Sequence, residues 1–278
     1  MTARDVAHLL FNPSAIVRVR QLLPSMCGGA DFGRNQYLYR FRMPDVSAGN
    51  PERVYALGNL GRKFLSAEFG LLVDKRFRPE GAHLSFTQMI HNLVLTRFLV
   101  AAHRWAGTRS GVRLSQVRIC YELGAGTADT GERGKREKGA VIPDGWLLFQ
   151  KVERGKKTVD FPVLVEIDRG TMFKKRFKEH VASRIEFVRS GAYREMFGQE
   201  AVVIVYATTG TTGEGVEGRR GALAEWTEEL FKEQRRESWG RVFRFCSLSY
   251  GEIYAAPLFE GKVWYRPDLE SAVRLFEG

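Results

Sequence analysis

The stretch that decides the fold reads Ile142-Pro143-Asp144-Gly145 and, after a turn, Phe161-Pro162-Val163-Leu164-Val165-Glu166-Ile167-Asp168-Arg169-Gly170-Thr171. Proline has no backbone N–H to donate, so Pro143 suits the first position of a strand that continues through residues 146–149. The run Arg154-Gly155-Lys156-Lys157 is typical of a turn, and residues 158–167 have the length and apolar character of a buried strand. The stretch therefore predicts two consecutive strands.

Three carboxylates belong to these strands. Asp144 lies just inside the first strand, and Glu166 and Asp168 lie at the end of the second. Side chains two residues apart on a strand share a face, and pairing of the strands as a hairpin brings Asp144 beside the same end. A cluster of oxygen ligands suits Mg²⁺ or Mn²⁺, which activate water and stabilise charge on a phosphate. The alternative is a set of solvated strand ends, with Asp168 paired to Arg169 or Lys174.

Asp144, with Glu166 twenty-two residues later, resembles the PD-(D/E)xK nuclease pattern. The tract from Pro143 to Thr171 more narrowly resembles the replication-relaxation family of plasmid and mobile-element proteins. This resemblance implies a winged helix joined to a nuclease-like domain, metal ligation by Asp144, Glu166 and Asp168, and DNA nicking during replication. Asp168 stands where the nuclease pattern has a lysine, so activity requires a cation from elsewhere or is lost.

A helix is predicted over residues 172–189. Its apolar stripe consists of Phe173, Phe177, Val181, Ile185 and Val188. Arg176, His180 and Arg184 follow one flank of that stripe at helical spacing. They are candidates to supply the missing cation, so His180 and Arg184 join the three acids as candidate catalytic residues. A plain salt-bridging flank is the alternative.

The N-terminal segment has the pattern of a helix-turn-helix followed by strands. Thr2 can cap a first helix, and a second helix runs from Pro13 to about Leu23, with Ile16, Val19 and Leu23 facing inward. Strands over 36–43 and 53–57 and a helix over 59–69 complete a predicted winged-helix domain in residues 1–75. The candidate DNA-binding residues are Arg18, Arg20, Gln21, Arg40 and Arg42. The alternative is a small α+β module that holds a partner protein.

Size and charge favour a nucleic-acid partner. The chain has 278 residues, a formal net charge of +11 and a sequence pI near 9.7. A generally basic surface is the alternative, and charge alone does not distinguish DNA from RNA, or a homodimer from a complex with a replication partner protein. Three distant cysteines and no signal-peptide pattern predict a cytoplasmic location without a membrane span.

The remaining elements predict an α/β (α+β) fold in which helices flank a mixed sheet, and their order agrees with the PD-(D/E)xK nuclease-like domain that the resemblance implies for residues 84–278. The predicted helices cover 85–105, 223–237 and 268–276, and the predicted strands cover 112–121, 201–206, 242–246 and 261–265. Residues 70–84 read as a linker and 124–139 as a basic loop. The functional prediction is a DNA-binding protein of plasmid or mobile-element replication with metal-dependent nicking activity. Its rival is a non-catalytic initiator or regulator with a degenerate nuclease fold.

Overall fold

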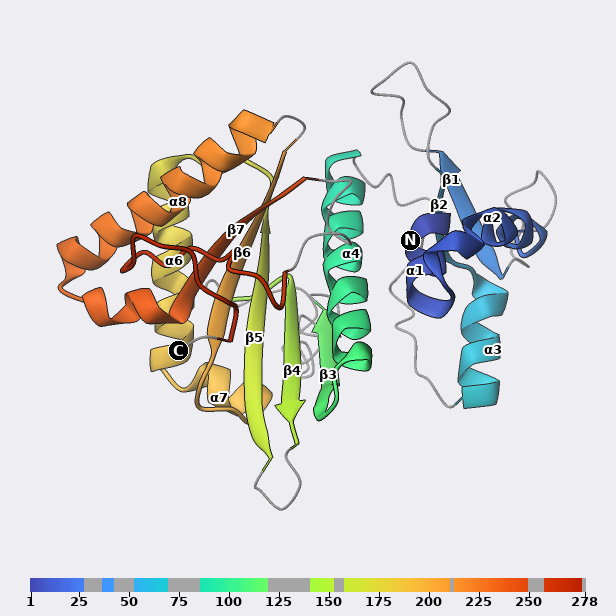
Figure 1. The fold of residues 1–278 in the computed structure, drawn as a ribbon, viewed down its shortest axis with the longest axis horizontal. Coiled ribbons are helices and arrows are strands. Elements are labelled where there is room, and N and C mark those ends of the chain that lie inside the picture. Colours follow the sequence, from blue (N-terminus) through green and yellow to red (C-terminus); the bar gives the residue numbers. More distant parts are fainter. Residues whose placement is uncertain are drawn as a thin grey trace, which may run out of the picture. The chain divides into compact units, whose positions relative to one another are not determined.

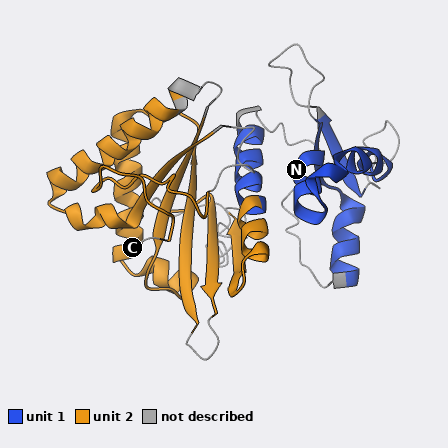
Figure 2. Cartoon of the chain, viewed as in Figure 1, with its two compact units in different colours: residues 1–100 blue, residues 101–278 orange. Residues whose placement is uncertain are grey.

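The computed structural model describes residues 1–27, 37–42, 53–69, 86–119, 141–152, 158–210, 213–249 and 258–276. These residues belong to two compact units, Met1–Val100 and Ala101–Gly278 (Figure 2). The division between the units falls inside helix α4 (Phe86–Thr108). The predicted boundary between a winged-helix and a nuclease-like domain, at residues 75 to 84, stays a prediction. Within the described ranges, no helix has the length and apolar character needed to cross a membrane.

Unit 1 follows the predicted order of helices and strands. Its elements are α1 (Ala3–Leu10), η1 (Pro13–Ala15), α2 (Ile16–Ser25), β1 (Leu38–Arg42), β2 (Arg53–Leu57) and α3 (Asn59–Phe69). The side chain of Thr2 accepts from the backbone N–H of Asp5, which confirms the predicted N-cap. Strands β1 and β2 pair antiparallel. The winged-helix assignment itself stays a prediction.

The core of unit 1 forms between α1 and α2. Val19 and Leu23 are buried, and Ile16 is partly buried against the same cluster, as the helical spacing predicted. Because one face of α2 is committed to this core, Arg18, Arg20 and Gln21 project from its exposed side. The predicted DNA-contacting residues of α2 are therefore accessible.

Unit 2 is built on a five-stranded mixed sheet (Figure 1). The strands, in their spatial order, are β3 (Val112–Ile119), β4 (Gly145–Lys151), β5 (Val159–Asp168), β6 (Val203–Gly210) and β7 (Phe243–Ser249). The first three pair antiparallel, and β5, β6 and β7 run parallel. The connections contain α6 (Lys174–Arg189), α7 (Ala192–Phe197), α8 (Gly213–Gln234) and η3 (Glu237–Val242). The predicted order α-β-β-β-α-β-α-β is confirmed, with α7 as an addition.

The sheet buries both faces, so alternate residues of each strand enter different cores. On one face, Trp146, Leu164 and Tyr206 pack against Phe177 and other apolar side chains of α6 and α8. On the other face, the ring of Phe149 contacts aromatic side chains that include Trp105 of α4 and Phe259. This alternation fixes which side of β5 each of its carboxylates occupies.

Two helix predictions in unit 2 are wrong, one in its start and one in its existence. Helix α8 begins at Gly213, ten residues before the predicted start, although glycines punctuate its first turns. The predicted helix over 268–276 is absent, since Trp264 and Val273 form an antiparallel bridge. Val273 and Leu275 are buried two residues apart, which is the period of extended chain.

The amphipathic stripe of α6 also differs from the prediction. Phe177, Val181 and Ile185 are buried, but Phe173 is 85% exposed. The helix begins at Lys174, so Phe173 has extended backbone and its side chain does not follow the helical face. The predicted linker over 70–84, the predicted turn at 154–157 and the basic loop over 124–139 lie outside the described residues.

Candidate functional site

Asp144 lies directly before β4, which begins at Gly145 and not at Pro143 as predicted. The β4–β5 ladder ends with the pair Gly145 and Val165. Beyond that pair, Oδ2 of Asp144 accepts a hydrogen bond from the backbone N–H of Ile167 at 2.8 Å. The predicted hairpin is therefore confirmed, and it brings Asp144 beside the end of β5. One carboxylate oxygen satisfies the backbone where the ladder stops.

Glu166 is 4% exposed, and its carboxylate is paired with Arg184 of α6. Nε of Arg184 donates to Oε1 of Glu166 at 2.5 Å. Burial works to lower the pKa of Arg184, but the charge of Glu166 opposes it and the net pKa lies above its usual value. The two charges therefore neutralise one another inside the protein.

Asp168 points to the same face of the sheet as Glu166, as the two-residue spacing predicted, and is paired with α8. Arg219 donates to both carboxylate oxygens, through Nε to Oδ2 at 2.9 Å and through a terminal nitrogen to Oδ1 at 3.0 Å. The guanidinium also lies 5.1 Å from the ring centre of Trp226. This bidentate geometry, with two parallel hydrogen bonds, adds specificity as well as strength to the pairing of an arginine with a carboxylate.

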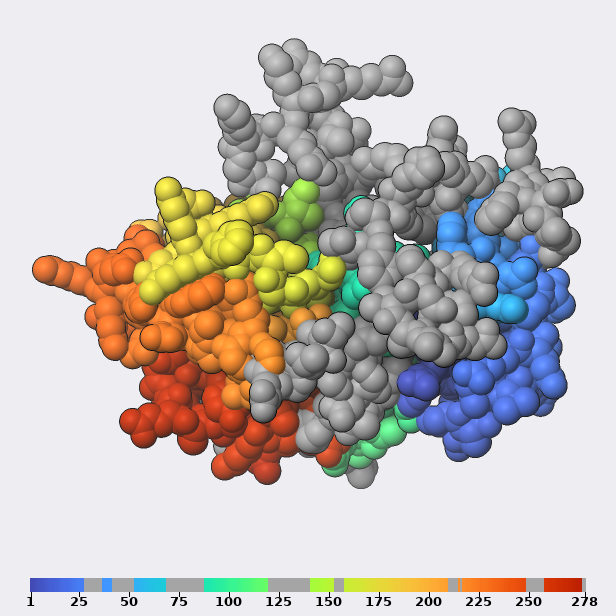
Figure 3. Space-filling model, turned by 90° about the horizontal axis from the view of Figure 1, so that it is seen from above, coloured from blue at the N-terminus to red at the C-terminus, as the bar shows by residue number. Residues whose placement is uncertain are grey.

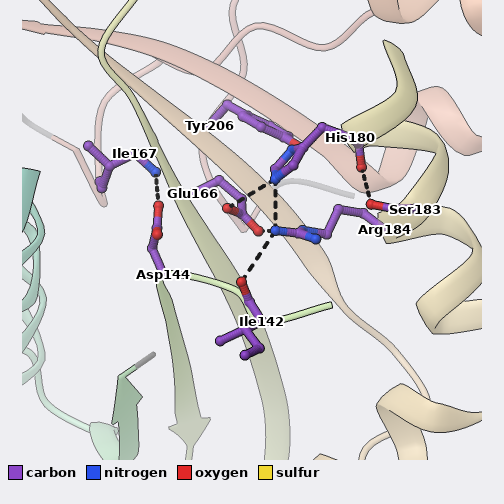
Figure 4. Close-up of polar contacts among 8 residues, drawn as sticks. All are labelled: Ile142, Asp144, Glu166, Ile167, His180, Ser183, Arg184 and Tyr206. Atoms are coloured by element: carbon purple, nitrogen blue, oxygen red, sulfur yellow. Dashed lines mark hydrogen bonds and ion pairs between the residues drawn. The ribbon is translucent and has the colours of Figure 1, made fainter. Parts of the chain in front are cut away.

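His180 connects Arg184 to the sheet (Figure 4). A terminal nitrogen of Arg184 lies 2.8 Å from Nε2 of His180, and Nδ1 lies 2.9 Å from the hydroxyl of Tyr206. Arginine can only donate, so Nε2 accepts and the proton of the neutral ring lies on Nδ1. Burial first, and the charge of Arg184 second, lower the pKa of His180 to about 4. The histidine is therefore neutral at physiological pH.

We expect this pKa to be visible in the stability of the protein. An unfolded histidine titrates near 6.5, so the unfolded state takes up the proton first as pH falls. Between pH 6.5 and about 4, the titration of His180 therefore lowers the free energy of unfolding by about 1.4 kcal/mol for each unit by which the pH falls. Urea titrations across this range test the slope, which His180→Gln should reduce. Imidazole NMR should give the Nδ1–H tautomer; a midpoint near 6.5 in the folded protein contradicts the assignment.

Among the described residues, no group of three or more histidine, cysteine, aspartate and glutamate side chains is placed to hold a metal ion in this arrangement. Glu166 and Asp168 each bind a guanidinium, which has the same sign of charge as the metal. The dashed contacts of Figure 4 direct Asp144 toward Ile167 and Glu166 toward Arg184 and His180. The prediction that Asp144, Glu166 and Asp168 bind Mg²⁺ or Mn²⁺ stays a prediction.

The cations of the site differ in part from those the sequence suggested. Arg184 forms an ion pair with Glu166, as one of the predicted cations. Asp168 forms its ion pair with Arg219, which was not among the predicted site residues. The missing signal was the early start of α8, without which residue 219 lies in a loop. Of the other predicted DNA-binding residues, Arg40 is exposed on β1, and the side chain of Arg42 lies outside the described part.

Comparison with protein families identifies a relationship for most of the chain. A family model described as replication-relaxation matches residues 1–203, which include unit 1, β3 to β5, α6 and α7. The matched region contains Asp144, Glu166, Asp168, His180 and Arg184 but ends before Arg219. No curated protein and no solved structure matches the chain.

Proposed function

The chain belongs to the replication-relaxation family, and from that premise we propose that it is a DNA-binding protein that acts in the replication of a plasmid or other mobile element. We further propose that its nuclease-like site has a structural role and does not hydrolyse DNA. The observation that carries the second part is the buried pair between Glu166 and Arg184. An internal guanidinium there supplies the positive charge that a nuclease takes from a metal ion.

Charge and exposure support the DNA-binding part. The chain carries a net charge of +11, and neutralisation of phosphates by lysine and arginine accounts for most sequence-independent DNA affinity. Arg18, Arg20 and Gln21 project from α2, and Arg40 projects from the two-stranded sheet of the same unit. This distribution of exposed polar and basic side chains suits a helix in the major groove of DNA, beside a pair of strands that contacts the DNA backbone.

The chemistry of the strand ends supports the non-catalytic part. Asp168 occupies the position where the nuclease pattern places a lysine, so the usual stabiliser of the phosphate charge is absent. Arg184 and Arg219 do not replace that lysine as free cations, because each is engaged with a carboxylate. The site therefore holds matched internal charges.

Metal-dependent DNA nicking is the second candidate function. The observation that favours it is the placement of Asp144 and Glu166 at neighbouring ends of paired strands, in an element order that the PD-(D/E)xK resemblance implied. In that function the acids bind Mg²⁺ or Mn²⁺, and Arg184, which contacts His180, supplies the positive charge that the missing lysine would provide. Glu166 must then release Arg184 before it can bind the metal ion.

One experiment separates the two candidates. Supercoiled plasmid is incubated with the full chain and Mn²⁺, and with Asp144→Asn and Glu166→Gln as comparison variants. We expect no metal-dependent nicking by any of the three proteins, and equal retention of duplex DNA in a gel-shift assay. Nicking by the wild type that both substitutions abolish overturns the non-catalytic proposal and selects the second candidate.

Duplex binding is tested through its salt dependence. Arg18→Gln together with Arg20→Gln removes two phosphate contacts, so the slope of log K against log salt should become shallower by about 1.8. Lys262→Gln, an exposed position of unit 2, is the matched control and should leave the slope unchanged. A wild-type protein that binds duplex RNA more tightly than duplex DNA at equal salt contradicts the proposal.

A further inference from the structure

Phe173 is the most exposed large apolar side chain in the described part of the chain. It precedes α6 with extended backbone, at φ −77° and ψ 159°. Neighbours in extended chain point in opposite directions, and Met172 packs against the core between the sheet and its helices. The burial of Met172 therefore directs Phe173 into solvent.

The segment around Phe173 is held at both ends. On one side, Oδ2 of Asp168 accepts from the N–H of Gly170 at 3.1 Å, in a turn where Gly170 has φ +76°. Asp168 is itself fixed by Arg219. On the other side, the carbonyl of Phe173 accepts from the N–H of Phe177 at 2.9 Å. The exposed ring is thus presented by an ordered backbone.

Three cations follow the ring in the first turn of α6: Lys174, Lys175 and Arg176. This turn contains no acidic residue, and positive charge is unfavourable at the positive end of a helix dipole. Helix stability therefore does not account for these residues. Lys174 is paired with Glu229, but neither Lys175 nor Arg176 has an ion pair within the part of the chain that the structure describes. Both are exposed.

We propose that Phe173, Lys175 and Arg176 form a binding surface for single-stranded DNA. The ring stacks on one unpaired base, and the two cations contact phosphates of the same strand. The surface consists of the residue before α6 and two residues of its first turn, and α6 contacts α8. Figure 3 shows the yellow atoms of this part of the chain beside the orange atoms of α8 at the exterior of unit 2. This inference rests on the proposed function, because it assumes a DNA partner, and it adds a strand that is not paired.

The chemistry of the surface favours a single strand over other partners. A duplex keeps its base faces stacked inside, so a lone ring has no partner there, whereas an unpaired base exposes its face. An apolar protein partner requires apolar neighbours around the ring, but the three exposed residues that follow Phe173 in the chain are charged. A lipid surface shares the charge requirement, and the experiment below tests it directly.

The test measures binding of the full chain to labelled oligothymidylate by fluorescence anisotropy. Phe173→Ala should weaken binding about tenfold, and Phe173→Trp should retain it. Phe173→Leu keeps an apolar side chain without a ring and should resemble the alanine variant. Lys175→Gln with Arg176→Gln should make the slope of log K against log salt shallower by about 1.4. Leu269→Ala, another exposed apolar position of unit 2, is the control and should bind as the wild type does.

Several outcomes overturn the inference. They are equal affinity of wild type and Phe173→Ala, equal affinity of the leucine and tryptophan variants, and tighter Phe173-dependent binding to vesicles of anionic phospholipid than to oligothymidylate. Duplex binding is measured in parallel, and we expect Phe173→Ala to leave it unchanged. If the wild type does not bind duplex DNA, the proposed function is contradicted. If Phe173→Ala leaves the affinity for oligothymidylate unchanged, only the role of Phe173 is contradicted.

Discussion

Replacement of Arg184 by methionine should lower the free energy of unfolding by about 3–5 kcal/mol, because it removes the guanidinium that is paired with the buried carboxylate of Glu166. Both side chains are 6% exposed, so water does not compensate for the lost partner. The same change removes the donor that Nε2 of His180 accepts from. Urea unfolding followed by circular dichroism measures the loss.

The double variant Glu166→Gln with Arg184→Met separates the effect of an unbalanced buried charge from the effect of replacing the arginine side chain. It removes both charges, so we expect it to recover most of the stability that Arg184→Met loses. Arg189→Met is the matched control on the same helix. Its pair with Glu186 is about half exposed, and the substitution should cost no more than about 1 kcal/mol. A single Arg184→Met variant as stable as this control contradicts the assignment of a buried pair.

The geometry of β4 and β5 could be read from the sequence because strands have a short, rigid period. Two-residue spacing is enough to place Glu166 and Asp168 on one face, and Pro143 with the intervening turn is enough to indicate a hairpin. The structure confirms both, and it places Asp144 beside Ile167. Local pattern therefore predicted which strand ends meet.

Arg184, which contacts Glu166, was among the predicted cations, but the partner of Asp168 could not be predicted in the same way. Arg219 reaches Asp168 from fifty-one residues away, and its position depends on where α8 starts. Glycines at 213, 215, 218 and 221 lower helix propensity, so the pattern favoured a loop where tertiary contacts maintain a helix. The prediction that Phe173 is buried was wrong for a related reason. Helical spacing extended the apolar stripe of α6 to Phe173, one residue before the helix begins.

The largest stability effect in unit 1 should come from Asp5. Its side chain is fully buried, and Oδ1 accepts from Nε of Arg97 at 3.1 Å. Its other oxygen accepts from the backbone N–H of Thr2 in the capping box that begins α1. Asp5→Ala therefore leaves the buried guanidinium of Arg97 without this partner and should cost about 3–5 kcal/mol.

Thr2→Ala provides the comparison that identifies the cause. It removes the side-chain cap of α1 but leaves the ion pair, so it should cost only about 1 kcal/mol. The difference between the two variants contains the ion pair of Asp5 with Arg97, ninety-two residues away in α4, and the hydrogen bond that Asp5 accepts from the backbone N–H of Thr2. Hydrogen exchange should show lost protection in α1 for both variants and in the turns of α4 around Arg97 only for Asp5→Ala. Equal losses in both variants would mean that the capping box, and not the buried ion pair, holds the N-terminal helix in place.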